Sequence, residues 1–298
     1  MSRRGWLLFL AMSVIWGVPY LLIKVAVEDL SPVVVVFGRC VIGAALLLPW
    51  TLARGHLRPA LRHWRWLLAF TLIEMTGPWL LLGFAEQTLS SSLTGLLVAA
   101  VPFVAAVAGR LLGEERLTPV RVAGMALGVV GIGVLLGLDV GGAELVPLLA
   151  VALTVVGYGT APMIVTRRLG AVPGVAASSV ALVVTAVVYA PFAALRWDEV
   201  GAAPGSALLS VAVLGLVCTA LALALFFALI REVGPQRALV ITFLNPAVAV
   251  LLGVLLLDEP FTLGLALGLP LVVAGCVLAT RRNEPRAAPD PAVETPVP

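Results

Sequence analysis

The sequence carries little charge for its length. Of its 298 residues only 12% are Asp, Glu, Lys or Arg, whereas ordinary soluble domains carry about 25%. Hydrophobic residues make up 61% of the chain, and the mean hydropathy is +1.11. This composition excludes an ordinary soluble domain and is typical of a membrane protein.

Cysteine and histidine are also scarce. Cys40, Cys218 and Cys276 lie inside apolar segments with no paired spacing, so we expect small core residues rather than disulfides or metal ligands. His56 and His63 share one basic loop, where charge and contact with lipid headgroups explain them. We therefore predict no metal site and no cofactor.

Motifs for catalysis are missing from the apolar segments. They contain no HExxH motif, no Ser–His pair and no paired carboxylates, which argues against hydrolytic chemistry. The stretch GIGVLLG has the wrong spacing for a nucleotide loop and no preceding strand. We predict that the protein is not an enzyme, and keep a membrane-embedded enzyme and a non-transporting scaffold as alternatives.

Long apolar runs are what the sequence does have. They recur in blocks of roughly 20 residues, the length that a helix needs to cross a hydrocarbon core about 30 Å thick. The blocks show no period-two alternation, so helices are expected rather than barrel strands. We predict an all-α integral membrane protein with ten transmembrane helices: Trp6–Val27, Pro32–Leu52, Trp66–Ala85, Leu93–Leu112, Val120–Leu138, Leu145–Val165, Val175–Leu195, Ala207–Ile230, Ala238–Leu257 and Phe261–Thr280.

One polar segment occurs twice. Residues 111–118 read LLGEERLT and residues 255–262 read LLLDEPFT, at an offset of 144 that also relates Gly124 to Gly268 and Gly131 to Gly275. Five predicted helices separate the copies, so they should face opposite sides of the membrane. We predict two inverted five-helix repeats, residues 5–138 and 145–280, followed by a disordered cytoplasmic tail, residues 281–298, rich in Pro and Ala.

The basic residues indicate the orientation. Cytoplasmic loops of membrane proteins carry an excess of Lys and Arg, and with both termini inside, 16 of the 19 basic residues fall on the cytoplasmic side: Arg3, Arg4, Arg54, Arg58, Arg62, Arg65, Arg110, Arg116, Arg121, Arg167, Arg168, Arg231, Arg237, Arg281, Arg282 and Arg286. We predict a multi-pass protein of the cell membrane with both termini cytoplasmic, and no nucleic-acid partner.

Several segments resemble one transporter family. WGVPYLLIKVAVEDLSP, followed by Arg39 in the second span, resembles the opening of an EamA-type domain of the drug/metabolite transporter superfamily. Residues 90–136 and 234–279 resemble the fourth and fifth helices of its two copies. In the second copy Tyr158-Gly159 replaces Trp16-Gly17. The resemblance implies ten helices in two inverted repeats that move small metabolites without ATP.

Two charges lie deep inside predicted spans. Glu74 is about eight residues inside the third span, where burial costs about 2.5–3.5 kcal/mol, and such residues usually face a cavity or a partner. It is a candidate carboxylate for proton coupling or substrate binding. Arg39 in the second span is its natural partner in an ion pair, the interpretation we favour, or else a ligand for a substrate anion.

Several aromatic and amide side chains are expected at a similar depth in the membrane. Trp16 and Tyr20 share one face of the first helix, and Trp79 follows Glu74; lining of a cavity and packing are both open for them. Tyr158 and Asn245 lie near mid-depth of their spans. Lys24 is three residues from the outer end of its span, so we expect its ammonium group to snorkel outward.

The predicted function is therefore transport. Inverted repeats typically hold a substrate at their interface and alternate access by rocking. We predict a secondary transporter of small organic metabolites, an exporter of amino acids or related compounds, with protons as a candidate coupling ion carried by Glu74. The predicted substrate-binding residues are Trp16, Tyr20, Arg39, Glu74, Trp79, Tyr158 and Asn245. The sequence does not indicate the oligomeric state.

Overall fold

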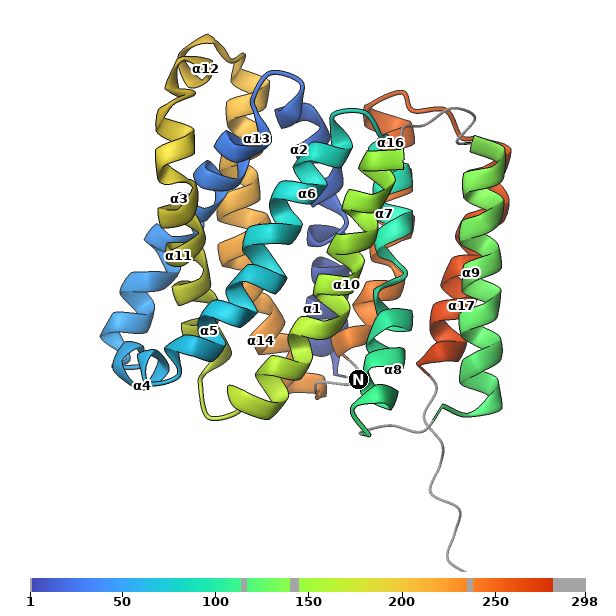
Figure 1. Cartoon of the computed structure of the whole chain (residues 1–298), viewed down its shortest axis with the longest axis horizontal. Helices are drawn as coiled ribbons and strands as arrows, with labels where there is room; N and C mark the ends of the chain where they lie inside the picture. The colour runs from blue at the N-terminus through green and yellow to red at the C-terminus, as the bar shows by residue number, and fades with distance from the viewer. Residues whose placement is uncertain (1, 114–116, 140–144, 235–237, 281–298) are drawn as a thin grey trace, which may run out of the picture.

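The structure is a computed structural model that describes residues 2–113, 117–139, 145–234 and 238–280. The described residues form helices joined by short connections, with no β-strand among them. The helices stand side by side in one bundle (Figure 1). This agrees with the predicted all-α architecture; the predicted tail, residues 281–298, lies outside the described residues.

Eight helical segments of the described chain are long and apolar enough to cross a membrane: Arg3–Val27, Pro32–Ala53, Trp64–Glu86, Ser91–Leu111, Pro119–Leu138, Leu145–Arg168, Gly174–Ala194 and Gly205–Val233. Two further apolar helices, Val240–Leu256 and Leu263–Ala279, are at most 17 residues long, short of the roughly 20 that a full crossing needs. The ten predicted spans thus correspond to eight long helices and two shorter ones.

Proline interrupts some of these spans, because it has no N–H to continue the helix. Breaks precede Pro19 in the first span and Pro102 in the fourth. The helices beside these breaks are α1 (Arg3–Ile15), α2 (Val18–Val27), α7 (Ser91–Val98) and α8 (Val101–Leu111). The continuous spans are α3 (Pro32–Ala53), α9 (Pro119–Asp139), α10 (Leu145–Arg168) and α11 (Gly174–Ala194).

Two spans each contain a π-helical segment at matching positions. The third span consists of α5 (Trp64–Thr71), η1 (Leu72–Thr76) and α6 (Gly77–Glu86). The eighth consists of α13 (Gly205–Gly215), η2 (Leu216–Leu221) and α14 (Ala222–Val233). The π segments start at Leu72 and Leu216, and 216 − 72 = 144 is the offset that relates the two polar copies. Such segments are rare and frequently mark functional sites.

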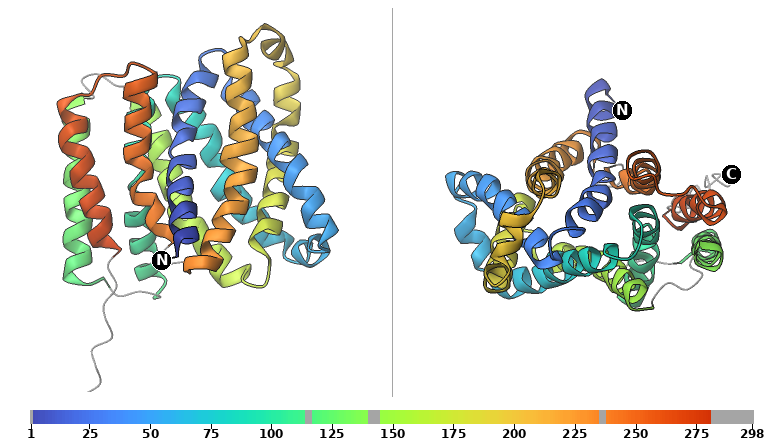
Figure 2. Two further views of the ribbon diagram at one scale, coloured as in Figure 1. Left: turned by 180° about the vertical axis from the view of Figure 1, so that it is seen from behind. Right: turned by 90° about the horizontal axis from the view of Figure 1, so that it is seen from above.

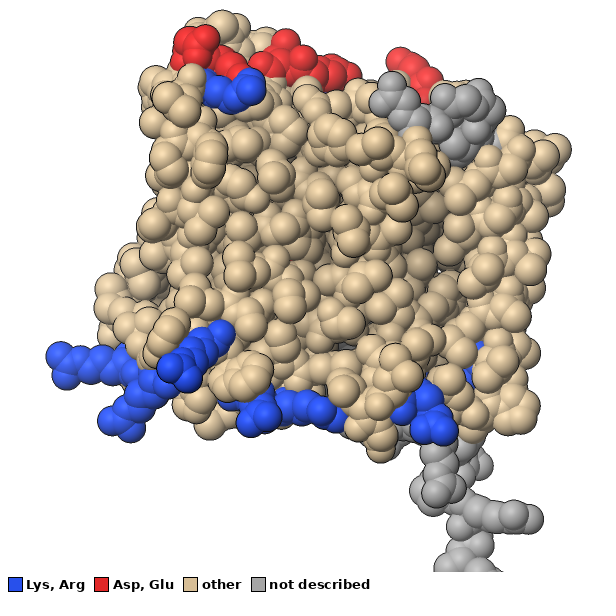
Figure 3. Space-filling model, in the orientation of Figure 1, with Lys and Arg blue, Asp and Glu red and all other residues tan. Residues whose placement is uncertain are grey.

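The two ends of the bundle carry opposite charge. Figure 3 shows Lys and Arg gathered at one end and Asp and Glu at the other. We call them the arginine end, which carries α4 (Leu57–Leu61), and the acidic end, which carries α12 (Trp197–Ala202). Described charged residues at the arginine end include Arg54, Arg58, Arg62, Arg65, Arg167 and Arg168, and those at the acidic end include Glu28, Asp29, Asp198, Glu199, Asp258 and Glu259.

The two polar copies lie at opposite ends, as predicted. LLGEERLT follows α8 at the arginine end, and LLLDEPFT joins α16 (Asn245–Leu256) to α17 (Leu263–Ala279) at the acidic end (Figure 1). Residues 114–116 of the first copy lie outside the described residues. Both copies start a helix in the same way, because Thr118 Oγ1 accepts from the Arg121 N–H and Thr262 Oγ1 from the Leu265 N–H.

Glycines bring α9 and α17 into direct contact, side by side in Figures 1 and 2. A Cβ added to Gly268 would lie 3.1 Å from the Gly131 carbonyl oxygen, and one added to Gly275 would lie 2.7 Å from that of Gly124. These two contacts are equivalent under the 144-residue offset. Reciprocal contacts of this kind are what two halves related by a two-fold axis make.

Candidate functional site

Tyr158 of α10 lies where two of the hydrophobic clusters meet. Its side chain interacts with that of Trp79, and electrostatically with Glu74, Tyr20 and Arg39. Four of the other six residues predicted from the sequence therefore interact with this tyrosine, which makes a cluster of five. They come from five separate elements, namely α2, α3, η1, α6 and α10.

Arg39 is a buried cation, only 8% exposed. Its guanidinium lies over the ring of Trp79, 3.7 Å from the centroid, and its Nε donates to Thr219 Oγ1 at 2.8 Å. The Thr219 hydroxyl in turn donates to the Leu214 carbonyl at 2.8 Å. The cation is thus held by the aromatic ring of Trp79, on α6, and by the hydroxyl of Thr219, on η2.

Glu74 belongs to the other π segment, η1. Pro78 offers no N–H to the carbonyl four residues before it, and the Gly77 N–H bonds the Leu72 carbonyl in the wider π turn. Residues of α11 hold this turn: Thr76 Oγ1 is 2.8 Å from Thr185 Oγ1, and the Tyr189 hydroxyl donates to the Thr76 carbonyl at 2.7 Å.

The ion pair expected between Glu74 and Arg39 is not formed. In the described part of the chain no salt bridge joins the two side chains, and Glu74 Oε2 is buried with no hydrogen-bond partner. The reason lies in the packing, because η1 packs on α10 and α11 whereas Arg39 is bound to η2 and Trp79. The site therefore holds a guanidinium and a carboxyl group that both interact with Tyr158 and do not pair with each other.

Trp16 and Asn245 lie at a joint between helices instead of in the Tyr158 cluster. The Trp16 ring packs on Phe226 with centroids 4.7 Å apart. In the amide orientation that its surroundings require, Asn245 donates to the carbonyls of Ser13 at 3.1 Å and Ile241 at 2.9 Å. Its amide thus joins the end of α1 to the start of α16.

Lys24 is partly exposed and is bound by the protein at the acidic end. Its Nζ donates to the backbone carbonyl of Glu86 at 2.8 Å, at the C-terminus of α6. The Glu86 side chain is itself fully buried, and both of its carboxylate oxygens have no hydrogen-bond partner. Glu86 was not predicted as a buried residue, because the third span was expected to end at Ala85. The one signal in the sequence was a carboxylate directly after an apolar block.

Glu259 joins the end of α16 to the start of α7 at the acidic end of the bundle. Asp258 has a left-handed backbone with φ 52°, and the Glu259 N–H bonds the Gly253 carbonyl at 3.2 Å, in a tight turn at the end of α16. The turn places the Glu259 carboxylate at the N-terminus of α7, where it accepts from the N–H of Ser91 at 2.7 Å and of Ser92 at 3.0 Å. The Ser92 hydroxyl also donates to it. A carboxylate at a helix N-terminus is electrostatically favourable.

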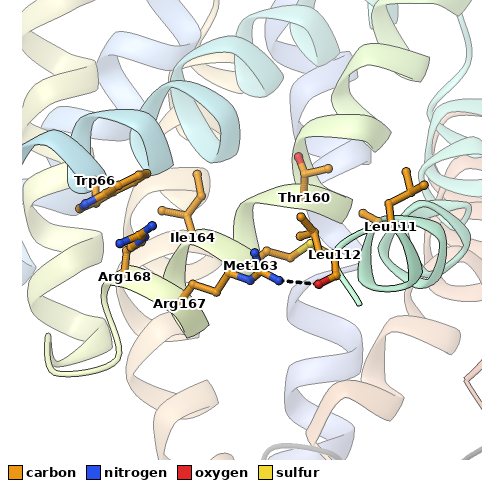
Figure 4. A pocket seen from close by; sticks show the side chains of 9 residues that line it. Trp66, Leu111, Leu112, Thr160, Met163, Ile164, Arg167 and Arg168 are labelled. Carbon is orange, nitrogen blue, oxygen red and sulfur yellow. Dashed lines mark hydrogen bonds between the residues drawn. The ribbon is translucent and has the colours of Figure 1, made fainter. Parts of the chain in front are cut away.

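A separate groove lies at the arginine end. It encloses about 420 Å³ between α5, α8 and α10, and Trp66, Arg167 and Arg168 are among its lining residues (Figure 4). None of the Tyr158 cluster residues lines it. The described residues include no group of three or more His, Cys, Asp or Glu side chains that could hold a metal ion. Cys40, Cys218 and Cys276 are buried free thiols, in agreement with the expected core role.

Comparison with known proteins gives one consistent result. The sequence model of the EamA-like transporter family matches twice, over residues 3–137 and 145–281. The chain is 29% identical to the uncharacterized inner membrane transporter YedA of Escherichia coli (strain K12), over 91% of this chain and 88% of YedA. It is 28% identical to the uncharacterized transporter YvbV of Bacillus subtilis (strain 168), over 96% and 95%. One protein of known crystal structure shares the fold, with a TM-score of 0.66 and 23% identity over 94% of this chain and 97% of its own.

Proposed function

We propose that this chain, which belongs to the EamA-like transporter family, exports amino acids or related small metabolites by alternating access without ATP. Membership of the family and the names of its relatives indicate a membrane transporter. The observation that carries the substrate class is the guanidinium of Arg39 and the carboxyl group of Glu74, which both interact with Tyr158 and do not pair with each other.

A zwitterionic substrate fits such a site. A planar guanidinium can bind a substrate carboxylate with two parallel hydrogen bonds, and an unpartnered carboxylate can accept from a substrate ammonium group. Tyr20, Trp79 and Tyr158 form the aromatic walls in this proposal. Trp16 and Asn245 belong to the binding region through the α1–α16 joint, which adjusts when the halves move.

The proposed movement is rocking of two inverted five-helix repeats, residues 5–138 and 145–280. The matching π segments and the reciprocal glycine contacts support it. Cross-contacts between the halves support it too, since Arg39 of the first half binds η2 of the second, and Thr185 of the second half binds η1 of the first. The positive-inside rule places the arginine end in the cytoplasm, and the Glu259 contact then closes the outer end.

Transport assays on the full-length protein in sealed proteoliposomes test this function. We expect counterflow of one or more amino acids without chemical change, and loss of that counterflow in Arg39→Gln. If Glu74 also carries the coupling proton, Glu74→Gln retains exchange, because the amide oxygen can still accept from the ammonium group, but loses uptake driven by a pH gradient. A protein that chemically converts its substrate, or that exchanges amino acids normally without Arg39, would contradict the proposal.

Labelling of single cysteines tests the orientation. In a background that lacks Cys40, Cys218 and Cys276, a cysteine at Thr262 should react with an impermeant thiol reagent from outside, and one at Thr118 only after permeabilisation. Reaction of both from the outside would contradict the inverted arrangement of the two repeats.

A further inference from the structure

The groove at the arginine end has the composition of an amphipathic binding site. Its lining includes Trp66 of α5, Leu111 of α8, and Met163, Ile164, Arg167 and Arg168 of α10. In Figure 4 Arg168 lies beside Trp66 and Arg167 extends to Leu112, with Ile164 and Met163 of α10 between them. Among the residues that the structure describes, which leave out 114–116, no acidic side chain lines the groove.

The cationic part of the groove is held in place. The Arg168 guanidinium lies over the Trp66 ring, 4.7 Å from the centroid. Stacking on an aromatic face leaves the N–H donors of a guanidinium directed outward in its own plane, where an oxyanion can accept from them. Arg167 Nη2 donates to the Leu112 carbonyl at 3.0 Å, which ties the end of α10 to the end of α8.

The depth of the groove suits a lipid. The arginine end marks one membrane surface, and tryptophans gather at the level of the headgroups; Trp64 and Trp66 are 53% and 40% exposed. Leu111, 81% exposed, offers a large apolar surface beside the groove. A ligand with an anionic group at the arginines and hydrocarbon along α8 and α10 matches both parts.

We propose that this groove binds one anionic phospholipid, with its phosphate at Arg168 and an acyl chain along Met163, Ile164 and Leu111. Basic pockets between transmembrane helices on the cytoplasmic side are suited to anionic headgroups. The lipid would touch α8 of the first half and α10 of the second, so its presence would restrain rocking between them. Rocking belongs to the proposed function, but the lipid site itself needs no substrate.

Native mass spectrometry of the full-length protein tests this site. The protein is released from bilayers that contain equal amounts of phosphatidylglycerol and phosphatidylcholine, and the retained lipid is counted. We expect one phosphatidylglycerol to be retained in preference to phosphatidylcholine by roughly tenfold, the factor that one charge-assisted hydrogen bond supplies. Arg168→Gln and Trp66→Leu should each remove most of that preference.

A matched control is Arg58→Gln, because Arg58 lies in α4 at the same end and outside the groove; its retained lipid should equal that of the unaltered protein. Arg58 and Arg168 are both exposed, so neither change to glutamine should prevent folding, and thermal unfolding verifies this. Equal retention of the two lipids, or an unchanged preference in Arg168→Gln, overturns the proposal. If inorganic phosphate raised the temperature of thermal unfolding as much as phosphatidylglycerol does, the proposal would be overturned in favour of a site for small anions.

Discussion

Arg39 and Trp79 form a stacked pair within the bundle, with the guanidinium carbon 3.7 Å from the ring centroid. The pair joins the second and third spans of the first half, while the Arg39 Nε bond to Thr219 reaches the second half. Movement between the halves must therefore alter the surroundings of this cation. Arg39 is therefore placed to bind substrate, and its contacts should differ between the two arrangements of the halves.

We expect Arg39→Lys to lose transport even though it keeps the charge. A lysine ammonium cannot reproduce the planar stack or the forked hydrogen bonds of a guanidinium. The loss of a desolvated cation–π contact should lower the free energy of unfolding by about 2 kcal/mol. Thermal unfolding and counterflow measure the two effects.

The matched control for this change is Arg54→Lys. Arg54 lies over Trp50 at 5.4 Å, in an exposed pair at the arginine end. Stability and transport should both stay unchanged there. A similar loss in the two variants would mean that the effect of Arg39→Lys does not come from the buried site.

The separation of Glu74 from Arg39 predicts additive effects on stability. If the two side chains do not pair, the changes in unfolding free energy of Glu74→Gln and Arg39→Gln should sum to that of the double variant apart from coupling through their shared neighbour Tyr158, and neither change should rescue the other. Thermal or denaturant unfolding of the four proteins in the same detergent provides the measurement. Rescue of one variant by the other would instead reveal an ion pair in the state that dominates in solution.

Glu259→Gln should loosen the start of α7. The change removes a charge that accepts hydrogen bonds from Ser91 and Ser92 at the helix N-terminus, and we expect a loss of about 1–2 kcal/mol. Hydrogen exchange at the amides of the first turn of α7 should become faster. Asp258→Asn is the control in the same turn, since asparagine accepts a left-handed backbone and Asp258 has φ 52°. Equal effects of the two changes would argue against the cap.

Gly275→Ala should disrupt the contact between α9 and α17. A Cβ there would lie 2.6 Å from the Gly128 nitrogen and 2.7 Å from the Gly124 oxygen, both backbone atoms that no side-chain rotation can move. Overpacking of this kind typically costs about 1–3 kcal/mol. Gly133→Ala, on α9 with nothing within 4 Å of the added carbon, should leave the melting temperature unchanged or raise it. An unaltered melting temperature for Gly275→Ala would show that the helices separate more easily than their packing suggests.

The membrane class, the helical architecture and the family all follow from the sequence alone. Hydrophobic length and the positions of arginine act locally along the chain, so they can be read without knowing which helices touch. The same holds for the offset of 144 residues, which placed the two polar copies at opposite ends.

Which charged side chains come into contact depends on the packing of distant helices. Arg39 is bound by Thr219, 180 residues away, and no local pattern specifies that contact. Depth along two spans suggested that Arg39 and Glu74 would pair, but depth does not say which way a side chain points around its helix. The π turn at Leu72–Thr76 alters that direction, and neighbouring helices then set the partners. Glu86 shows the same limit, because whether a carboxylate at the end of a helix is solvated or buried depends on the loops and helices that pack over it.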